Sequence, residues 1–578
     1  MLKLLKYLKK SIVPIIGIIA LVIIQAACDL SLPEYTSNIV NIGVQQMKPD
    51  YILNVGAKML GVALLSMAAT IGISFVASRV AASLGSRLRQ EVFTKVVNFS
   101  SNEMDKFSTA SLITRSTNDI QQIQNLMVML LRIVIYAPIV GIGGIIKVLS
   151  TENTMAWIIV VAVTTIIIVV FALFKVVMPK FKQVQNLIDK LNLVTREILT
   201  GMLVIRAFGT EKHEEKRFDK ANEDLTKTNL FINRTMAMMM PLMMLIMNII
   251  TIIIVWNGAY AVDSGTMQVG DMMAFIQYTM QIIMAFLMIS MVSIMLPRAA
   301  VAAGRVDEII NTELSIKDPI NPISFEDDKK GILEFKNVSF RYPNADEYVL
   351  ENITFTAKKG ETTAFIGSTG SGKSTLINLI PRFYDVTEGE IVFDGVNIKD
   401  VSQHELRAKI GYVPQKGVLF SGNIESNIKY GKKSISDEAI KKAVEISQAK
   451  EFIESAEKGY ETEIAQGGTN VSGGQRQRLS IARAIAKSPE LYIFDDSFSA
   501  LDYKTDAALR KALGKETKER AVLIVAQRIS TILNADKIIV LEEGKIAGIG
   551  THKQLMNNCE VYRQIAFSQL SKEELDNE

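Results

Sequence analysis

The stretch TTAFIGSTGSGKSTLINLI, residues 362–380, decides the fold of the C-terminal part of the chain. An apolar run typical of a strand leads to Gly367, a glycine-rich loop follows, and a helical pattern begins near Lys373. The loop reads G-x-x-x-x-G-K-S. Its glycines let backbone N–H groups close around phosphate oxygens, and the N-terminus of the following helix adds a favourable dipole. The stretch therefore predicts a phosphate-binding loop in an α/β domain.

The residues of this loop are the first candidate site. They are Gly367, Ser368, Thr369, Gly370, Ser371, Gly372, Lys373, Ser374 and Thr375. In such a loop Lys373 reaches the β- and γ-phosphates and Ser374 binds Mg²⁺. Asp495 ends a second apolar strand, where the other metal-binding acid of a nucleotide hydrolase is expected. These residues predict ATP and Mg²⁺ as cofactors.

The rest of the chain differs sharply in composition. Hydrophobic residues make up 49% of the 578 residues, and long apolar runs are confined to residues 11–300. A helix needs about 20 apolar residues to cross a bilayer. Six runs qualify, at 12–32, 56–78, 127–149, 155–178, 236–262 and 271–296. We therefore expect a membrane domain over 1–320 and a nucleotide-binding domain over 321–578.

Lysine and arginine predict the orientation of the spans. They are frequent before the first span and in the connections 79–126 and 179–235, whereas 33–51, 150–154 and 263–270 hold only Lys48 among them. Basic connections stay in the cytosol. Both termini and the nucleotide-binding domain are expected there, with the chain crossing the cytoplasmic membrane several times. A net charge of +4 gives no support for nucleic-acid binding, and the two distant cysteines predict no disulfide framework.

Three features of the membrane region have open interpretations. The polar interruptions at about 100–116 and 206–222 fit either solvated connections or elbows that dock on the cytosolic domain. The methionine-rich last two spans fit either helix packing or a cavity for ligands of varied shape. Asp29 is a costly residue in a membrane and a functional candidate, or it lies at the interface beside Pro33 and Glu34.

The stretch NVSGGQRQRLSIARAIAKSP, residues 470–489, resembles the signature motif of the ATP-binding cassette (ABC) family, with Val471 where leucine is usual. Other family motifs follow in order: Tyr342 matches the aromatic that stacks on adenine, Gln415 the Q-loop, and SALD at 499–502 the D-loop. TRSTND at 114–119 and VIRAF at 204–208 resemble the exporter membrane domain and suggest that both interruptions are coupling helices. The chain resembles a bacterial ABC exporter half-transporter.

That resemblance implies a fold and a partner. The expected fold is six transmembrane helices of the type I exporter kind, fused to an α/β P-loop NTPase domain with an antiparallel β subdomain and a helical subdomain. Two nucleotide-binding domains meet head to tail in the family, so a second half-transporter completes each site. The residues implied to bind nucleotide across that interface are Ser472, Gly473, Gly474 and Gln475. Gln415 is implied to contact the metal and to act in hydrolysis.

The sequence departs from the family at two hydrolytic positions. Asp496 stands where a glutamate acts on the attacking water, and Gln527 stands at the position of the switch histidine. Aspartate is shorter by one methylene, and glutamine cannot carry the charge of an imidazolium. We expect a site that binds ATP but hydrolyses it slowly, in a heterodimeric exporter of amphipathic small molecules, with substrate and membrane lipids as further partners. The alternatives are a homodimer with two slow sites, a lipid or peptide exporter or flippase, and an ATP-dependent membrane regulator that transports nothing.

Overall fold

The computed structural model describes residues 6, 8–9, 11–151, 155–326, 331–343, 345–432 and 434–569. The chain forms two compact units. The membrane unit comprises Met1–Val97 and Thr109–Thr312, and the nucleotide unit comprises Asn98–Ser108 and Glu313–Glu578. Of the first predicted coupling segment, about 100–116, the part up to Ser108 thus belongs to the nucleotide unit and the part from Thr109 to the membrane unit. Each unit is described by itself.

The membrane unit is built from long helices. They are α1 (Ile12–Asn38), α2 (Pro49–Val97), α4 (Thr109–Ser116), α5 (Asn118–Met129), α6 (Ile135–Thr151), α7 (Ala156–Thr200), α8 (Met202–Phe208), α9 (Glu211–Ala237), α10 (Met239–Asp263) and α11 (Val269–Asn311), with π-helical turns η2 (Ile39–Val44) and η3 (Leu130–Val134). Continuous stretches of these helices give six segments long and apolar enough to cross a membrane. The six predicted membrane-spanning helices are therefore confirmed. Of the predicted connection 150–154, residues 152–154 lie outside the described residues.

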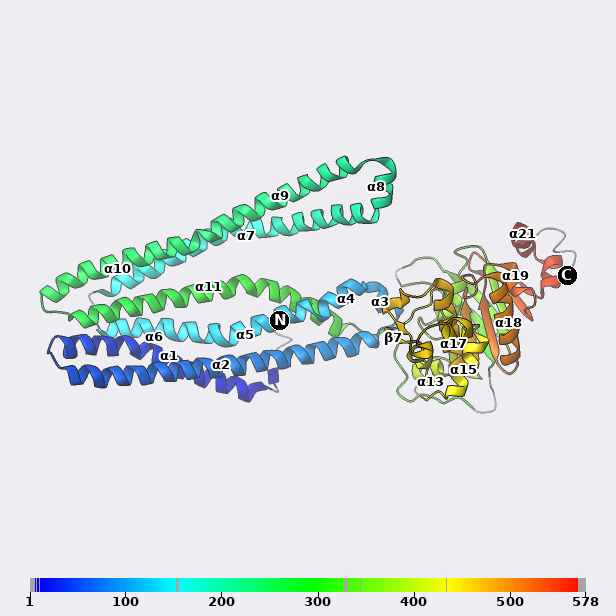
Figure 1. The fold of residues 1–578 in the computed structure, drawn as a ribbon, viewed down its shortest axis with the longest axis horizontal. Coiled ribbons are helices and arrows are strands. Elements are labelled where there is room, and N and C mark those ends of the chain that lie inside the picture. The colour runs from blue at the N-terminus through cyan, green and yellow to red at the C-terminus, as the bar shows by residue number, and fades with distance from the viewer. Residues whose placement is uncertain are drawn as a thin grey trace. The chain divides into compact units, whose positions relative to one another are not determined.

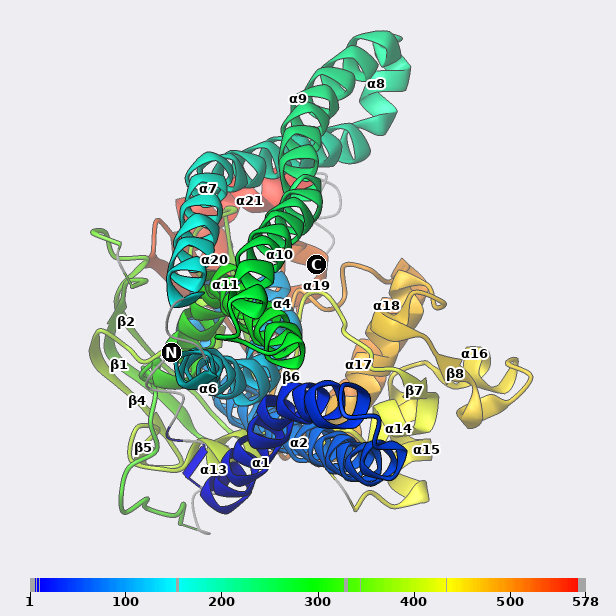
Figure 2. The ribbon, with the colours of Figure 1, turned by 90° about the vertical axis from the view of Figure 1, so that its left-hand side faces the viewer.

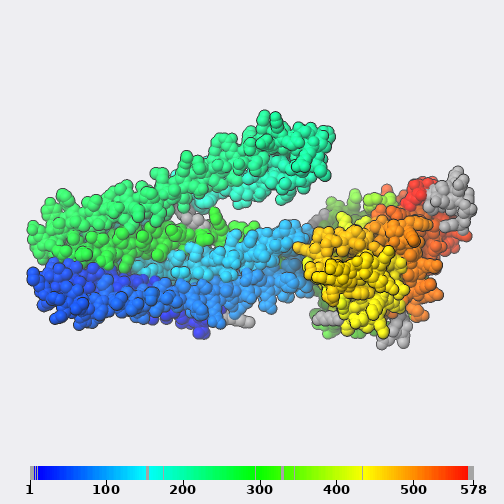
Figure 3. All heavy atoms as spheres, viewed as in Figure 1, coloured from blue at the N-terminus to red at the C-terminus, as the bar shows by residue number. Residues whose placement is uncertain are grey.

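Helices α7 and α9 form a hairpin with α8 at its tip (Figures 1 and 2). In the space-filling view this hairpin stands clear of α4 and α5 (Figure 3). Gly209 ends α8 in the left-handed conformation, with a φ of 61° that glycine adopts without strain. Helix α8 has no buried residue, and Leu203 and Phe208 are 83% and 78% exposed. The second polar interruption therefore presents apolar side chains at the end of an arm.

The nucleotide unit contains a six-stranded sheet in the order β12-β11-β3-β10-β9-β6. Its strands are β3 (Thr362–Gly367), β6 (Ile410–Val413), β9 (Leu491–Asp495), β10 (Ala521–Val525), β11 (Lys537–Glu542) and β12 (Lys545–Gly550). All neighbours pair in parallel except β12, which lies antiparallel at one edge. A parallel sheet is covered on both faces, so its strands are apolar almost throughout, as the burial of every residue of β9 and β10 shows.

A second sheet is antiparallel, in the order β2-β1-β4-β5. Its strands are β1 (Leu333–Phe340), β2 (Leu350–Ala357), β4 (Glu388–Phe393) and β5 (Val396–Asn397). The helical part includes α14 (Ile424–Lys429), α15 (Asp437–Ile446) and α17 (Gly473–Lys487). The predicted combination of a P-loop α/β domain, an antiparallel β subdomain and a helical subdomain is confirmed.

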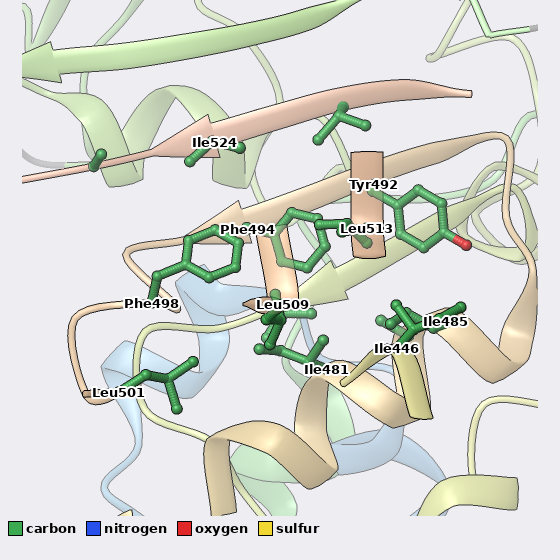
Figure 4. Close-up of a cluster of buried hydrophobic side chains, with 14 of the residues drawn as sticks. Ile446, Ile481, Ile485, Tyr492, Phe494, Phe498, Leu501, Leu509, Leu513 and Ile524 are labelled. Atoms are coloured by element: carbon green, nitrogen blue, oxygen red, sulfur yellow. The ribbon is translucent and has the colours of Figure 1, made fainter. Parts of the chain in front are cut away.

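A buried cluster joins the sheet to the helical part (Figure 4). Phe494 of β9 packs against Phe498, with ring centroids 5.3 Å apart. Ile481 of α17 and Leu509 of α18 (Tyr503–Glu516) are fully buried in the same cluster. Burying a side chain of this size contributes about 1.5–3 kcal/mol. The cluster therefore holds β9, whose last residue is Asp495, in a fixed position.

Asp394 is a buried carboxyl group next to a second acid. Its side chain is 0% exposed, and Lys409 Nζ lies 3.5 Å from its Oδ2 and 2.9 Å from Glu490 Oε2. The Ile332 N–H donates to its Oδ1 at 3.0 Å. Burial raises the pKa of Asp394 to about 6, and the neighbouring Glu490 adds to the effect.

We predict that Asp394→Asn changes how stability depends on pH. Because the pKa of this acid is higher in the folded chain than in the unfolded one, its protonated form stabilises the fold at low pH, and that contribution is lost as pH rises from about 4 to about 6. The free energy of unfolding of the variant, relative to that of wild type, should therefore rise by about 1–3 kcal/mol between pH 4 and pH 7. Thermal unfolding of the full chain in detergent at both pH values measures this. Asp400→Asn, at an exposed acid, is the control. If it changed the pH dependence of stability as much as Asp394→Asn does, the assignment to Asp394 would be contradicted.

Candidate nucleotide site

The candidate site lies along one edge of the parallel sheet. Strands β6, β9, β10 and β3 are neighbours in that order and run in the same direction, so their carboxyl ends meet. Four segments leave the sheet there: the phosphate loop after β3, Gln415 after β6, Asp496 after β9 and Gln527 after β10. This edge is where open α/β sheets bind their ligands.

The phosphate loop joins β3 to α12 (Lys373–Leu379). Gly370 and Gly372 have φ values of 86° and 93°, which a side chain would strain. A Cβ on Gly367 would lie 2.1 Å from the carbonyl oxygen of Leu541. Lys373 Nζ donates to the carbonyl oxygens of Gly367 and Ser368 at 2.9 and 2.6 Å, so its charge lies against the loop. Burial lowers the pKa of Lys373, and this partly desolvated cation in a glycine cradle fits a polyphosphate.

Ser374 and Asp495 form the candidate metal site. Ser374 Oγ donates to Asp495 Oδ1 at 3.2 Å, across 121 residues of chain. Asp495 is 6% exposed, and burial raises its pKa, with the neighbouring charge of Asp496 acting in the same direction. A hydroxyl and a buried carboxylate with an excess of negative charge match the hard oxygen ligands that Mg²⁺ takes.

Asp496 is held by both glutamines of the predicted hydrolytic set. Its Oδ2 accepts a hydrogen bond from Gln415 Nε2 at 3.1 Å and another from Gln527 Nε2 at 2.8 Å. These residues follow β6 and β10, the two strands that flank β9. The Asp496 backbone has a φ of 45°, a costly conformation for a residue with a side chain. The structure thus joins three predicted residues around one carboxylate oxygen.

Gln569 contacts the segment that carries Gln527, and no sequence motif predicts this contact. The side chain, at the end of α21 (Glu560–Gln569), donates from Nε2 to the carbonyl oxygen of Gln527 at 2.8 Å. Its Oε1 accepts from the Ile529 N–H, also at 2.8 Å. The two bonds bracket the backbone that carries Gln527. A single glutamine 42 residues away in an amphipathic helix carries no recognisable sequence signal.

Tyr342 lies directly after β1 beside a cavity of about 420 Å³. Its hydroxyl is 3.0 Å from Thr375 Oγ1, which connects it to the helix of the phosphate loop. Its ring meets Tyr384 edge to face at 5.3 Å. The wall of the cavity also includes Asn102, from α3 (Ser101–Lys106). A half-buried aromatic ring beside a cavity is suited to stacking on a base.

Helix α3 is bound to the nucleotide unit by two acids. Tyr384 OH donates to Asp105 Oδ2 at 3.0 Å, and the Ser315 N–H donates to Glu103 Oε1 at 3.0 Å. Glu103 Oε2 accepts in addition from the Ser100 N–H at 2.7 Å, which completes a capping box. Tyr384 therefore touches both Tyr342 and this helix, which forms the first part of the polar interruption.

The signature stretch is placed apart from the phosphate loop. Ser472 caps α17: its Oγ accepts from the Gln475 N–H at 3.2 Å, and its own N–H donates to Gln475 Oε1 at 3.0 Å. Gly473 has open space around the position of a Cβ. No hydrogen bond between described residues joins the N-terminus of α17 to residues 367–375. The glycines leave this positive helix end accessible to an anion from outside the chain.

A candidate phosphate loop and a candidate metal site, in one chain with six membrane-length helices, predict a membrane-bound ATPase. Comparisons with known proteins agree. Residues 15–286 match the model of the ABC transporter transmembrane region, and residues 350–499 match that of the ABC transporter. An uncharacterized ABC transporter ATP-binding protein of Mycobacterium tuberculosis (strain CDC 1551 / Oshkosh) is 39% identical, over 95% of this chain and 94% of that protein.

Two further proteins are similar. A putative multidrug export ATP-binding/permease protein of Staphylococcus aureus (strain NCTC 8325 / PS 47) is 37% identical over 64% of each chain. The structure of a bacterial Atm1-family ABC exporter with ATP bound has the same fold, with a TM-score of 0.80, 24% identity and coverage of 97% and 98% of the two chains. The chain belongs to the ABC transporter family and has fused membrane and ATP-binding parts.

Proposed function

We propose that this chain is one half of a heterodimeric ABC exporter of amphipathic small molecules, and that its own ATP site hydrolyses slowly. The observation that carries the proposal is the position of Asp496, whose Oδ2 accepts hydrogen bonds from Gln415 and Gln527. The two bonds occupy one of the two oxygens with which this carboxylate could contact an attacking water. In this proposal the site binds ATP and hydrolyses it slowly.

Reach is the physical reason for slow hydrolysis. Aspartate and glutamate differ by only about 0.4 in reference pKa, so basicity does not distinguish them. One methylene withdraws the carboxylate by about 1.5 Å, and a misplacement of about 1 Å can lower a rate roughly a hundredfold. Gln527 is used to bind Asp496 and provides no positive charge. In this proposal Lys373 holds the phosphates, Ser374, Gln415 and Asp495 hold Mg²⁺, and Tyr342 stacks on the base.

Two features support a partner chain. The accessible N-terminus of α17, with Ser472, Gly473, Gly474 and Gln475, is suited to bind the γ-phosphate of a nucleotide held by another chain. The apolar residues Leu203 and Phe208 at the tip of the α7–α9 arm are suited to dock on a partner's nucleotide unit. ABC exporters work as dimers, and a partner with glutamate and histidine at the two hydrolytic positions would have a competent site. We place both termini and the nucleotide unit in the cytosol.

The substrate class is supported from two sides. The relative from Staphylococcus aureus is described as a putative multidrug export protein. In this chain an apolar cavity of about 520 Å³ lies between α7 and α11 and is lined by Phe171, Met178 and Phe286. Lys175 and Ser290 are the polar residues of its lining. A mainly apolar pocket with a few polar groups is suited to amphipathic molecules.

The test is ATP turnover by the purified full chain, alone and with a co-purified partner half-transporter. Alone, the chain should bind a fluorescent ATP analogue yet hydrolyse ATP at least about tenfold more slowly than the pair. Lys373→Ala serves as the control that removes binding. Rapid turnover by the chain alone that Asp496→Asn abolishes would overturn the slow-site proposal.

A further inference from the structure

Asp29 is a carboxylate in the middle of a membrane-spanning helix. About 25 Å of helix separate it from Ile12 and about 22 Å from Val44, the two ends of the continuous segment. The hydrocarbon layer is about 30 Å thick. Wherever that layer is placed along this segment, Asp29 lies inside it. An ionisable residue at such a depth is costly and indicates function.

Neutral donors hold this carboxylate, and no cation does so among the described residues. Ser66 Oγ of α2 donates to Asp29 Oδ1 at 2.6 Å, and Tyr136 OH of α6 donates to Oδ2 at 2.6 Å. No ion pair between described residues includes Asp29. Glu34, little more than a turn further along α1, pairs with Lys147 at 2.7 Å. The two hydroxyls orient the Asp29 carboxyl group and supply no positive charge to it.

A proline one turn further on brings Gln281 to the backbone of Asp29. Pro33 has no N–H, so the carbonyl oxygen of Asp29 loses its helical hydrogen bond. Gln281 of α11 takes over this bond from its Nε2, at 3.0 Å. Its Oε1 is left buried and has no hydrogen-bond partner among the described residues. A buried acceptor without a donor is unfavourable and calls for a ligand that can donate.

We infer that Asp29 and Gln281 form a binding site for the ammonium group of an amphipathic organic amine. An ammonium supplies the missing positive charge to Asp29 and an N–H donor to Gln281 Oε1. Asp29 is half-buried, so part of its surface remains accessible. This inference rests on the proposed export of amphipathic molecules and narrows their class to amines.

The test measures equilibrium binding to the full chain in phosphatidylcholine nanodiscs, without ATP. The probe is monodansylcadaverine, a fluorescent primary amine, and its N-acetylated form is the uncharged counterpart. Wild type should bind the amine at least about tenfold more tightly than the acetylated form. Asp29→Asn should reduce this preference to within about twofold, because asparagine keeps the size and polar contacts of the side chain but not its charge.

Matched variants separate charge from structure. Ser66→Ala and Tyr136→Phe remove a bond to Asp29 but keep its charge, so both should retain the preference. Asp271→Asn is the control at another acid, which is likewise bound by neutral donors from Ser37 and Asn41. If Asp29→Asn does not fold, Gln281→Leu provides the second test, and it should weaken binding of the amine severalfold. Equal affinity of wild type for both probes, or a preference that survives Asp29→Asn, would overturn the site. Either result would leave the ATP turnover experiments unaffected, so a failure here differs from a failure of the proposed function.

Discussion

Changing Asp496 to Glu and Gln527 to His together should raise ATP hydrolysis at this chain's site by about tenfold to a hundredfold. The longer acid extends beyond the amide of Gln415 toward the attacking water. The histidine replaces the amide of Gln527, which binds Asp496 in the native chain, and adds a group that can carry positive charge near the γ-phosphate. Glutamate at 496 is placed at the end of β9 by the same buried strand as the native aspartate.

The measurement is steady-state ATPase of the heterodimer in which the partner's own site is inactivated. The single variants are the essential controls, since each restores half of the pair and should give a smaller gain than the double variant. Nucleotide affinity should stay within a few fold, because Lys373, Ser374 and Asp495 are unchanged. A double variant as slow as wild type would show that these two residues do not limit hydrolysis.

Replacing Ser472 by Arg should lower ATP turnover of the heterodimer by about a hundredfold or more. The side chain would fill the accessible N-terminus of α17 and remove the hydroxyl that caps it. The same proposed heterodimer with Lys373→Ala should keep its turnover within a few fold, because in this proposal that change affects only the slow site of this chain. Of these two substitutions in the same chain, Ser472→Arg should therefore lower ATP turnover far more than Lys373→Ala.

Ser472→Thr is the matched control, because threonine keeps the capping oxygen. Loss of an N-cap costs only about 1 kcal/mol, so Ser472→Arg should leave the chain folded, and thermal unfolding checks this. Nucleotide binding to this chain's phosphate loop should also persist in Ser472→Arg. If Lys373→Ala stopped turnover while Ser472→Arg did not, the proposed division of work between the two sites would be reversed.

The sequence was sufficient for features that depend on neighbouring residues. Membrane-length helices follow from continuous apolar runs, because the bilayer sets a minimum length. The phosphate loop follows from glycines at fixed spacing between a strand and a helix, because the loop geometry admits few other residues. Asp496 and Gln527 could likewise be identified as departures from family motifs, each within its own short stretch.

Contacts between distant segments depended on the tertiary structure. Gln415, Asp496 and Gln527 meet at one oxygen because β6, β9 and β10 are adjacent, and strand order is not written in any one strand. Gln569 reaches the switch only through the packing of α21.

Asp29 was visible in the sequence as a costly acid, but its site was not. Pro33 frees a carbonyl oxygen of α1, and only the packing of α11 against α1 brings Gln281 to that oxygen. Local patterns thus determined which elements and motifs this protein has. The packing of those elements decided which side chains meet, because hydrogen-bond partners are selected by position in space and not by separation along the chain.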